Sequence, residues 1–321
     1  MSILRINALQ VHAVDEEHSV PLLRGVDLEI EAGETVGLAG ESGSGKTLTG
    51  LSVMGLLPQP AVQLTGGELV FQGQPLTTLP VRARQQLRGA SMSMVFQEPM
   101  TALNPVQRVG LQLSELYQIH RPELSRALVR RQLLQALSDV GVSDAERRLE
   151  AYPHELSGGL RQRMMIAMAL ALKPALLICD EPTTALDVTI QAQVLDLIRG
   201  LTREMGTAVL FITHDLGVLA ELADRVAVMY GGVIVEQQPI DALFERPQHP
   251  YTEGLMRSIP RFDHAPRLRL DIIPGQVPQA NESVLGCRFH PRCARATARC
   301  QQESPKMDHG VACHHPGQAV C

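Results

Sequence analysis

The stretch TVGLAGESGSGKTLTGLSVMGLLP, residues 35–58, decides the fold class of this chain. A short apolar run at 35–39 leads into a glycine-rich turn at 40–47, and an apolar stretch then continues to Pro58. Strand, glycine-rich turn and helix in this order are the setting of a phosphate-binding loop, and the turn matches G-x-x-x-x-G-K-[ST]. We therefore predict an α/β fold built on a phosphate loop. The alternative is a chance loop of glycine and serine, which the correct flanking elements disfavour.

The turn supplies groups that suit a nucleotide. Its glycines let backbone N–H groups converge on phosphate oxygens, and the helix that begins near Lys46 directs its positive end at them. We expect Lys46 to reach the β- and γ-phosphates and Thr47 to place its hydroxyl on Mg²⁺. The predicted ATP-binding residues of the turn are Gly40, Ser42, Gly43, Ser44, Gly45, Lys46 and Thr47.

Two adjacent carboxylates follow the apolar run at the start of ALLICDEP, residues 175–182. Open α/β sheets bind ligands at the carboxyl ends of their strands, where Asp180 can hold Mg²⁺ through water. Glu181 is expected to polarise the water that attacks the γ-phosphate. Alternatively, Asp180 only caps the turn before Pro182. We assign Cys179 to core packing.

Other segments predict the elements around this site. Residues 3–11 and 22–30 alternate apolar and polar side chains, as antiparallel strands with one solvated face do. Apolar residues at helical spacing predict an inserted helical subdomain at about 100–160. We expect a strand in TAVLFITHD at 207–215 and helices at 190–205 and 216–223. A hairpin around Gly231-Gly232 is expected to follow.

Bulk properties exclude several classes of protein. The formal net charge of −5 over 321 residues gives no whole-chain field that attracts nucleic acid, so no nucleic-acid partner is predicted, with a local basic patch as the alternative. The start MSILRINALQ lacks the pattern of a signal peptide, and no apolar run reaches the roughly 18 residues of a membrane span. Any function at a membrane therefore requires partner chains that supply the spans.

The stretch ELSGGLRQRMMIAMALAL, residues 155–172, places Ser157, Gly158 and Gly159 before a long helix. These residues form either a second anion cradle or an ordinary helix cap.

LSGGLRQR is similar to the signature of the ATP-binding subunits of ABC transporters. The chain resembles that family over residues 1–240, since the other motifs occur in the family's order. They are the Walker A turn 40–47, the glutamine loop Phe96-Gln97-Glu98-Pro99, the Walker B acids, the D-loop Thr184-Ala185-Leu186-Asp187 and the switch Thr213-His214-Asp215.

The resemblance implies a fold and a set of roles. The fold is a P-loop NTPase domain with a mixed β-sheet core, an antiparallel β subdomain and the inserted helices. Gln97 is implied to contact Mg²⁺ together with Thr47 and Asp180, and His214 to contact the γ-phosphate. Asp187 is implied to communicate across a dimer interface. The residues 157–159 are implied to complete the ATP site of the opposite subunit.

One feature departs from the family's pattern. The family stacks an aromatic residue on adenine upstream of the phosphate loop, but VHAVDEEHSV at 11–20 has none. Ala13 occupies the corresponding place. His12 or His18 could stack on the base, although a solvated histidine is the alternative for both. The residue that contacts adenine is therefore not predicted.

The last 80 residues differ from the rest in their prolines and cysteines. Cys287, Cys293, Cys300 and Cys313 lie within 27 residues, and thiolates gathered so closely suit Zn²⁺ or an iron–sulfur cluster. Scattered structural thiols are the alternative, and Cys321 is expected to be unused. HPYTEGLMRSIPR at 249–261 and TALNPV at 101–106 resemble oligopeptide and dipeptide importer ATPases, in which the four cysteines are associated with a 4Fe–4S cluster.

We therefore expect an ABC ATPase domain at 1–240 and an importer-type extension with a metal or cluster site at 241–321. The resemblance implies an ATP- and Mg²⁺-dependent subunit that drives uptake of dipeptides or oligopeptides. It also implies a second, paralogous ATPase, two membrane permeases and an extracytoplasmic binding protein. The chain is then peripheral, at the cytoplasmic face of the inner membrane. Importers of nickel or glutathione, and soluble ABC ATPases without a transport role, are the alternatives.

Overall fold

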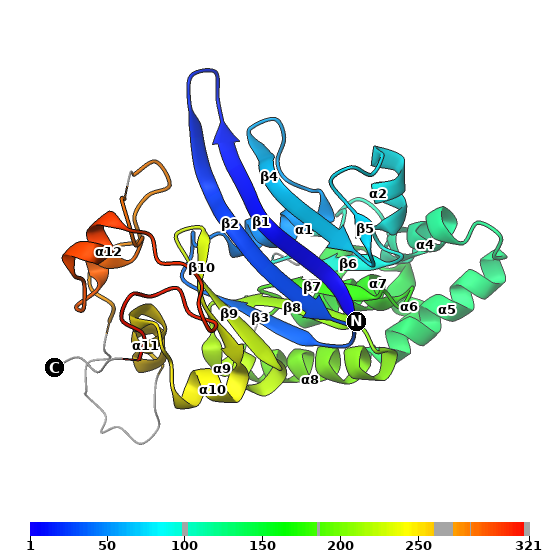
Figure 1. Cartoon of the computed structure of the whole chain (residues 1–321). Coiled ribbons are helices and arrows are strands. Elements are labelled where there is room, and N and C mark those ends of the chain that lie inside the picture. Colours follow the sequence, from blue (N-terminus) through cyan, green and yellow to red (C-terminus); the bar gives the residue numbers. More distant parts are fainter. Residues whose placement is uncertain (98–101, 185–186, 260–271, 283, 318–321) are drawn as a thin grey trace. The chain divides into compact units, whose positions relative to one another are not determined.

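The computed structural model describes residues 1–97, 102–184, 187–259, 272–282 and 284–317 (Figure 1). The chain divides into two compact units. The helical unit contains Met1–Ile3, Ile30–Glu34 and Thr78–Leu210, and the phosphate-loop unit contains Leu4–Glu29, Thr35–Thr77 and Phe211–Cys321. The residues of the quoted sequence motifs that lie outside the described part are Glu98, Pro99, Thr101, Ala185, Leu186, Pro260, Arg261 and Cys321.

An antiparallel sheet in the order β2-β1-β4-β5 belongs to the phosphate-loop unit. Its strands are β1 (Ser2–Val14), β2 (Ser19–Glu31), β4 (Val62–Phe71) and β5 (Gln74–Pro75). The register of β1 against β4 shifts between Asn7 and Gln10, where Ala8 has a φ of 46° and its N–H donates to Asp27. This bulge moves the buried side chains of β1 from even to odd positions. The two strands predicted at 3–11 and 22–30 are confirmed.

A second set of strands in this unit carries the phosphate loop. β3 (Thr35–Ala39) pairs in parallel with β9 (Arg225–Tyr230), and β9 forms the predicted hairpin with β10 (Val233–Pro239). Almost every residue of β3 and β9 is buried, as expected for a parallel pair covered on both faces. The helices of this region are α1 (Lys46–Met54), α9 (Leu216–Leu222) and α10 (Ile240–Glu245).

Helix α1 ends earlier than the sequence predicts. We expected the helix to continue to Pro58, but it ends at Gly55. Gly55 has a φ of 64°, and its N–H bonds back to Leu51 and Ser52 carbonyls. Glycine adopts this left-handed conformation without the steric cost that a Cβ brings, so it stops the helix before the proline does.

The C-terminal extension packs within the phosphate-loop unit. Its helices are α11 (Pro250–Arg257), a 3-10 turn (His290–Arg292) and α12 (Ala298–Gln302). The segment near Val311 bridges to Glu236 of β10, and the Ala312 N–H donates to the Val235 carbonyl at 2.8 Å. The compact units therefore do not divide at residue 240, and the boundary between 1–240 and 241–321 stays a prediction.

The helical unit is built on β6 (Met92–Val95) and β7 (Leu176–Asp180), which pair in parallel, with β8 (Ala208–Thr213) next to β7. Residues 208–210 of β8 belong to this unit. The helices predicted by pattern are confirmed, whereas β6 and α2 were not predicted. The helices of the unit are α2 (Val81–Leu87), α4 (Val109–His120), α5 (Arg126–Asp139), α6 (Ala145–Glu150), α7 (Gly158–Leu170) and α8 (Val188–Met205). Of the helices in the described ranges, none is both long and apolar enough to cross a bilayer.

Helix α8 offers a matched pair of glycines for a stability test. Gly206 caps the helix with a φ of 67°, whereas Gly200 lies exposed in its interior, and a Cβ at either position meets no atom within 4 Å. Gly206→Ala is expected to destabilise the protein by roughly 1 kcal/mol through the strained backbone. Gly200→Ala is expected to stabilise it by roughly 0.5–1 kcal/mol. Urea unfolding measures both changes, and effects of equal sign would contradict the helix end assigned here.

Candidate nucleotide site

The phosphate loop needs glycine at three places. Gly40, Gly43 and Gly45 have φ values of 150°, 78° and 108°, which side chains rarely tolerate. A Cβ on Gly40 would also collide with the Met229 carbonyl oxygen, and one on Gly45 would lie 2.5 Å from Leu23. The strand β9 and the loop therefore approach so closely that their backbones leave no space for a side chain.

Lys46 is folded onto the loop that precedes it. The side chain is buried, and Nζ donates to the carbonyls of Gly40 at 2.8 Å and Glu41 at 3.1 Å. Ser44 is also buried, and its Oγ has no hydrogen-bond partner in the described part of the chain. Ser42 and Gly43 are exposed at the tip of the turn.

Helix α1 begins at Lys46, as the sequence predicts, with Gly45 as its N-cap and no side chain capping it. The first N–H groups of a helix have no partner within the helix, and they carry the positive end of its dipole. The N-terminal end of α1 therefore suits an anion such as a phosphate. Thr47 follows in the first turn and is half-buried.

The structure brings Gln97 and Glu181 together in the helical unit. Glu181 Oε2 accepts hydrogen bonds from Gln97 Nε2 at 3.2 Å and from Thr184 Oγ1 at 3.0 Å. Asp180, the last residue of β7, is 2% exposed. Glu181 itself has a φ of 44°, a conformation that residues other than glycine rarely adopt and that recurs at functional sites. The sequence did not predict the contact with Thr184.

Ser157 and Asp187 cap helices. Ser157 Oγ accepts from the Leu160 N–H at 3.4 Å at the start of α7, where Gly158 and Gly159 form the first turn. Asp187 Oδ1 accepts from the Ile190 N–H at 2.9 Å at the start of α8. The roles toward a second subunit that the family resemblance implies remain predictions.

His214 follows β8 and is exposed in the phosphate-loop unit. The flanking residues fix the local backbone, because Thr213 Oγ1 accepts from the Asp215 N–H at 3.0 Å and Asp215 caps α9. The phosphate loop and His214 thus belong to one unit. The predicted residues of the other unit are Gln97, Ser157, Gly158, Gly159, Asp180, Glu181 and Asp187, and their assembly with the loop stays a prediction.

The two histidines considered for adenine already have polar contacts on the β1–β2 hairpin. His12 Nδ1 lies 2.7 Å from Ser19 Oγ, and the exposed His18 lies 3.5 Å from Asp15. Ala13 lies in β1 beside His12. No contact of the described residues identifies an adenine ligand here.

Four cysteines of the extension, Cys287, Cys293, Cys300 and Cys313, border one small cavity. They are free thiols, together with the buried Cys179 of β7. Burial raises the pKa of Cys287 to about 11. It also raises the pKa values of Cys293 and Cys313. The neighbouring thiols raise all three pKa values further. These groups are therefore protonated thiols at neutral pH in the absence of a cation. The residues that border the cavity are Cys287, Cys293, Cys300, Cys313, His249, Pro250, Phe289, His290, Arg295, His314 and His315.

The arrangement of these thiols does not form a site for a single metal ion. Among the described residues, no three side chains of His, Cys, Asp or Glu are placed to hold one ion. A tetrahedral Zn²⁺ with sulfur ligands at about 2.3 Å needs sulfurs only about 3.8 Å apart. The structure therefore contains no preformed metal site among the described residues that would support the predicted metal or cluster site. Four thiols round one cavity do supply the donor set of a larger thiolate-ligated group.

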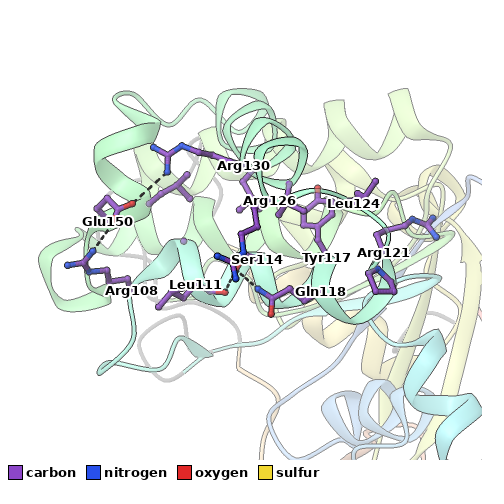
Figure 2. Close-up of a pocket in the computed structure, with 15 residues that line it drawn as sticks. Arg108, Leu111, Ser114, Tyr117, Gln118, Arg121, Leu124, Arg126, Arg130 and Glu150 are labelled. Carbon is purple, nitrogen blue, oxygen red and sulfur yellow. Dashed lines mark hydrogen bonds and ion pairs between the residues drawn. The ribbon is translucent and has the colours of Figure 1, made fainter.

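A separate groove of about 760 Å³ lies among α4, α5 and α6 (Figure 2). Four arginines line it, and Glu150 is the acidic residue among its described lining. Glu150 pairs with Arg108 at 2.7 Å and Arg130 at 3.7 Å. Arg121 and Arg126 line the same groove, so its net charge is positive.

Comparison with known proteins bears on the whole chain. Residues 23–184 match the family described as ABC transporter, and residues 235–300 match the oligopeptide/dipeptide transporter, C-terminal region. The chain is 48% identical to a probable peptide ABC transporter ATP-binding protein of Sinorhizobium fredii, over 99% of this chain and 96% of the relative. It is 46% identical to the oligopeptide transport ATP-binding protein AppD of Bacillus subtilis, over 95% and 93% respectively.

A solved structure agrees with these relatives. The fold is similar to the ATP-binding cassette MJ0796 in a dimeric post-hydrolysis state bound to ADP and Pi, with a TM-score of 0.66 and 26% identity. The similarity covers 74% of this chain and 98% of that one. Together with the phosphate loop and the paired acids, these matches show the family. The chain belongs to the ATP-binding ATPase subunits of ABC transporters, in the branch that carries the oligopeptide/dipeptide C-terminal region.

Proposed function

We propose that this ATPase drives the uptake of dipeptides or oligopeptides through partner membrane subunits. The observation that carries the proposal is the match of residues 235–300 to the oligopeptide/dipeptide transporter C-terminal region, in addition to the ABC cassette. Relatives that match over nearly the whole chain are named as peptide or oligopeptide transport ATP-binding proteins, which favours transport over the role of a soluble ABC ATPase. Nickel and glutathione are alternative solutes, which uptake measurements on the assembled transporter distinguish from peptides.

We assign the hydrolysis step to Glu181. Gln97 and Thr184 both donate to its Oε2, which supports a fixed carboxylate plane that can orient a water molecule. Glu181 takes a proton from this water while the water oxygen forms a bond to the γ-phosphorus. At the same time, the bond between the γ-phosphorus and the β–γ bridging oxygen breaks, and ADP leaves. Mg²⁺, when bound by Thr47, Gln97 and Asp180, neutralises charge on the β- and γ-phosphates.

The remaining residues have assigned roles in this proposal. Lys46 leaves its carbonyl partners and binds the β- and γ-phosphates, with the N–H groups of the turn around them. His214 contacts the γ-phosphate. Ser157, Gly158, Gly159 and Asp187 act across a dimer interface with a second ATPase, which we propose to be a paralogue.

The partners and location follow from the same proposal. Two permeases supply the membrane spans, and an extracytoplasmic binding protein delivers the peptide. The subunit is then peripheral on the cytoplasmic face of the inner membrane. We propose that an acidic segment of a permease docks in the groove of α4, α5 and α6, because Arg121 and Arg126 add positive charge there.

We also propose that Cys287, Cys293, Cys300 and Cys313 bind a 4Fe–4S cluster, with zinc as the lesser alternative. Their gathering round one cavity supports a thiolate-ligated group, and a cluster accepts ligands that are farther apart than those of one ion. No step of ATP hydrolysis is assigned to this group.

Glu181→Gln tests the role of the base. The variant keeps the size of the side chain and loses the proton acceptor, so kcat for ATP hydrolysis is expected to fall roughly 10²–10⁴-fold while ATP remains bound. Phosphate release by the assembled transporter measures kcat, and retention of labelled ATP measures nucleotide binding. Glu204→Gln, an exposed acid in α8, is the control. Normal hydrolysis by Glu181→Gln rejects this assignment.

Charge reversal tests the docking groove. In Arg121→Glu/Arg126→Glu, ATP hydrolysis stimulated by the permeases is expected to fall at least about fivefold, since like charges weaken association. Hydrolysis without permeases is expected to stay unchanged, because neither residue belongs to the nucleotide site. Arg203→Glu at the end of α8 is the control for added negative charge. Full stimulation of the double variant contradicts docking at this groove.

Metal analysis after anaerobic purification tests the cysteine site. We expect about four iron atoms per chain with the absorbance of an iron–sulfur cluster. Cys293→Ser is expected to lose the metal, whereas Cys179→Ala, which changes a core thiol, keeps it. Zinc at one equivalent supports the alternative. A folded protein free of iron and zinc rejects both.

A further inference from the structure

Glu41, the second residue of the phosphate loop, is bound through all of its polar groups. Its backbone N–H donates to Tyr251 Oη at 2.8 Å, its carbonyl accepts from Lys46 Nζ at 3.1 Å, and its carboxylate pairs with Arg292. Two of these three partners come from the C-terminal extension. We propose that Tyr251 and Arg292 are positioning residues for the ATP reaction, which hold the phosphate loop in shape through Glu41.

The Glu41–Arg292 pair has the geometry of a specific contact. Arg292 Nη1 and Nη2 donate to the two carboxylate oxygens at 2.6 and 3.1 Å, in the bidentate form that gives Arg–carboxylate pairs their direction. The Arg292 side chain is 5% exposed and that of Glu41 is 30% exposed. Solvent therefore screens this pair less than a surface pair.

The extension holds Arg292 from several sides. Nε donates to the Pro274 carbonyl at 2.9 Å, Nη2 donates to the Ile273 carbonyl at 3.3 Å, and the guanidinium lies 5.7 Å from the centre of the Tyr230 ring. Burial alone would lower the pKa of Arg292, but the contacts with Glu41 and Tyr230 outweigh it and the pKa is raised. The guanidinium thus stays charged and fixed in direction.

Tyr251 is equally constrained. It is fully buried at the start of α11, with ring centres 4.7 Å from Tyr230 and 5.4 Å from Phe289. Its N–H donates to His249 Nδ1 at 3.0 Å. Burial, and to a lesser degree the charge of Arg295, lowers the pKa of His249 to about 3, so this ring nitrogen is an acceptor at neutral pH. The hydroxyl that holds Glu41 therefore belongs to a rigid cluster.

This contact reaches the phosphate site through Lys46. The Glu41 carbonyl accepts from the lysine that binds the nucleotide phosphates and also from the Ser44 N–H at 3.2 Å. A displaced Glu41 therefore changes both the resting position of the ammonium and the turn that carries the phosphate-binding amides. Arg292 immediately precedes Cys293, so the loop between Cys287 and Cys293 is connected to the ATP site by one side chain.

The inference requires ATP binding, which follows from the family, and it depends on neither the peptide solute nor a bound metal. The competing explanation is that the pair only fastens the extension to the domain. A fastening role alters the unfolding temperature and leaves the affinity of the folded protein for ATP unchanged. A positioning role changes the affinity of the folded protein for ATP, while the stability of the rest of the fold stays the same.

Equilibrium binding of Mg-ATP to the full chain, and the KM and kcat of the assembled transporter, test the proposal. Glu41→Gln and Arg292→Gln are each expected to raise the Kd and KM for ATP roughly tenfold, with kcat at saturating ATP within about twofold. The double variant is expected to lose no more than either single one, because both remove the same interaction. Arg292→Lys keeps the charge without the two-pronged geometry and is expected to recover part of the affinity.

Arg295→Gln is the matched control. Arg295 lies in the same cysteine segment, is 9% exposed, and pairs with Glu253 of α11 at 2.5 Å. Within the described residues it makes no hydrogen bond or ion pair with the phosphate loop. It is expected to change the unfolding temperature and leave the Kd for ATP unchanged. If Arg292→Gln does not fold, Glu41→Gln carries the test, since this carboxylate is partly exposed. Wild-type affinity in Glu41→Gln, or an equal loss in Arg295→Gln, overturns the proposal.

Discussion

The phosphate loop depends on a buried ammonium held by two carbonyl groups of its own backbone. Lys46 Nζ donates to Gly40 and Glu41, and its side chain is 5% exposed. A buried charge without partners is costly, so the turn must present carbonyl oxygens to this group whenever no phosphate does. The glycine conformations at Gly40 and Gly45 make such a turn possible between β3 and β9. In the proposed function the lysine exchanges these carbonyl partners for phosphate oxygens, so that its charge is compensated in both states.

The acidic residues of the helical unit follow a different constraint. Glu181 follows a fully buried strand with its backbone in the left-handed region, and two donors meet at one of its carboxylate oxygens. Strain of this kind persists when neighbouring contacts over-determine the conformation. Gln97 lies two residues after β6, the parallel neighbour of β7, so the pairing of these two strands brings its amide to the carboxylate. The geometry is thus a consequence of parallel strands ending at one edge.

The sequence predicts the elements whose patterns are local. Four predicted features each depend on a few neighbouring residues: the strand 35–39, the start of α1 at Lys46, the hairpin at Gly231-Gly232 and the cap at Ser157. Contacts between distant segments are not encoded in this way. The Glu41–Arg292 pair joins residues 251 positions apart, and nothing in the turn or in the cysteine segment alone indicates it. The same reason explains why the gathering of four thiols is predictable from their spacing, whereas the distances between them are not.

The extension and the phosphate loop both contact the segment formed by Tyr230 and the Gly231-Gly232 turn. A segment this poor in apolar runs cannot bury enough surface to fold well alone, and it gains its core from Tyr230 of β9, against which Tyr251 and Phe289 pack. Tyr230 directly precedes the Gly231-Gly232 turn, where the Gly232 N–H donates to the Ser44 carbonyl of the phosphate loop. One side of this turn therefore contacts the extension and the other contacts the loop. A disturbance of the cysteine segment consequently reaches the phosphate loop through two routes, the Arg292 side chain and the β9–β10 turn.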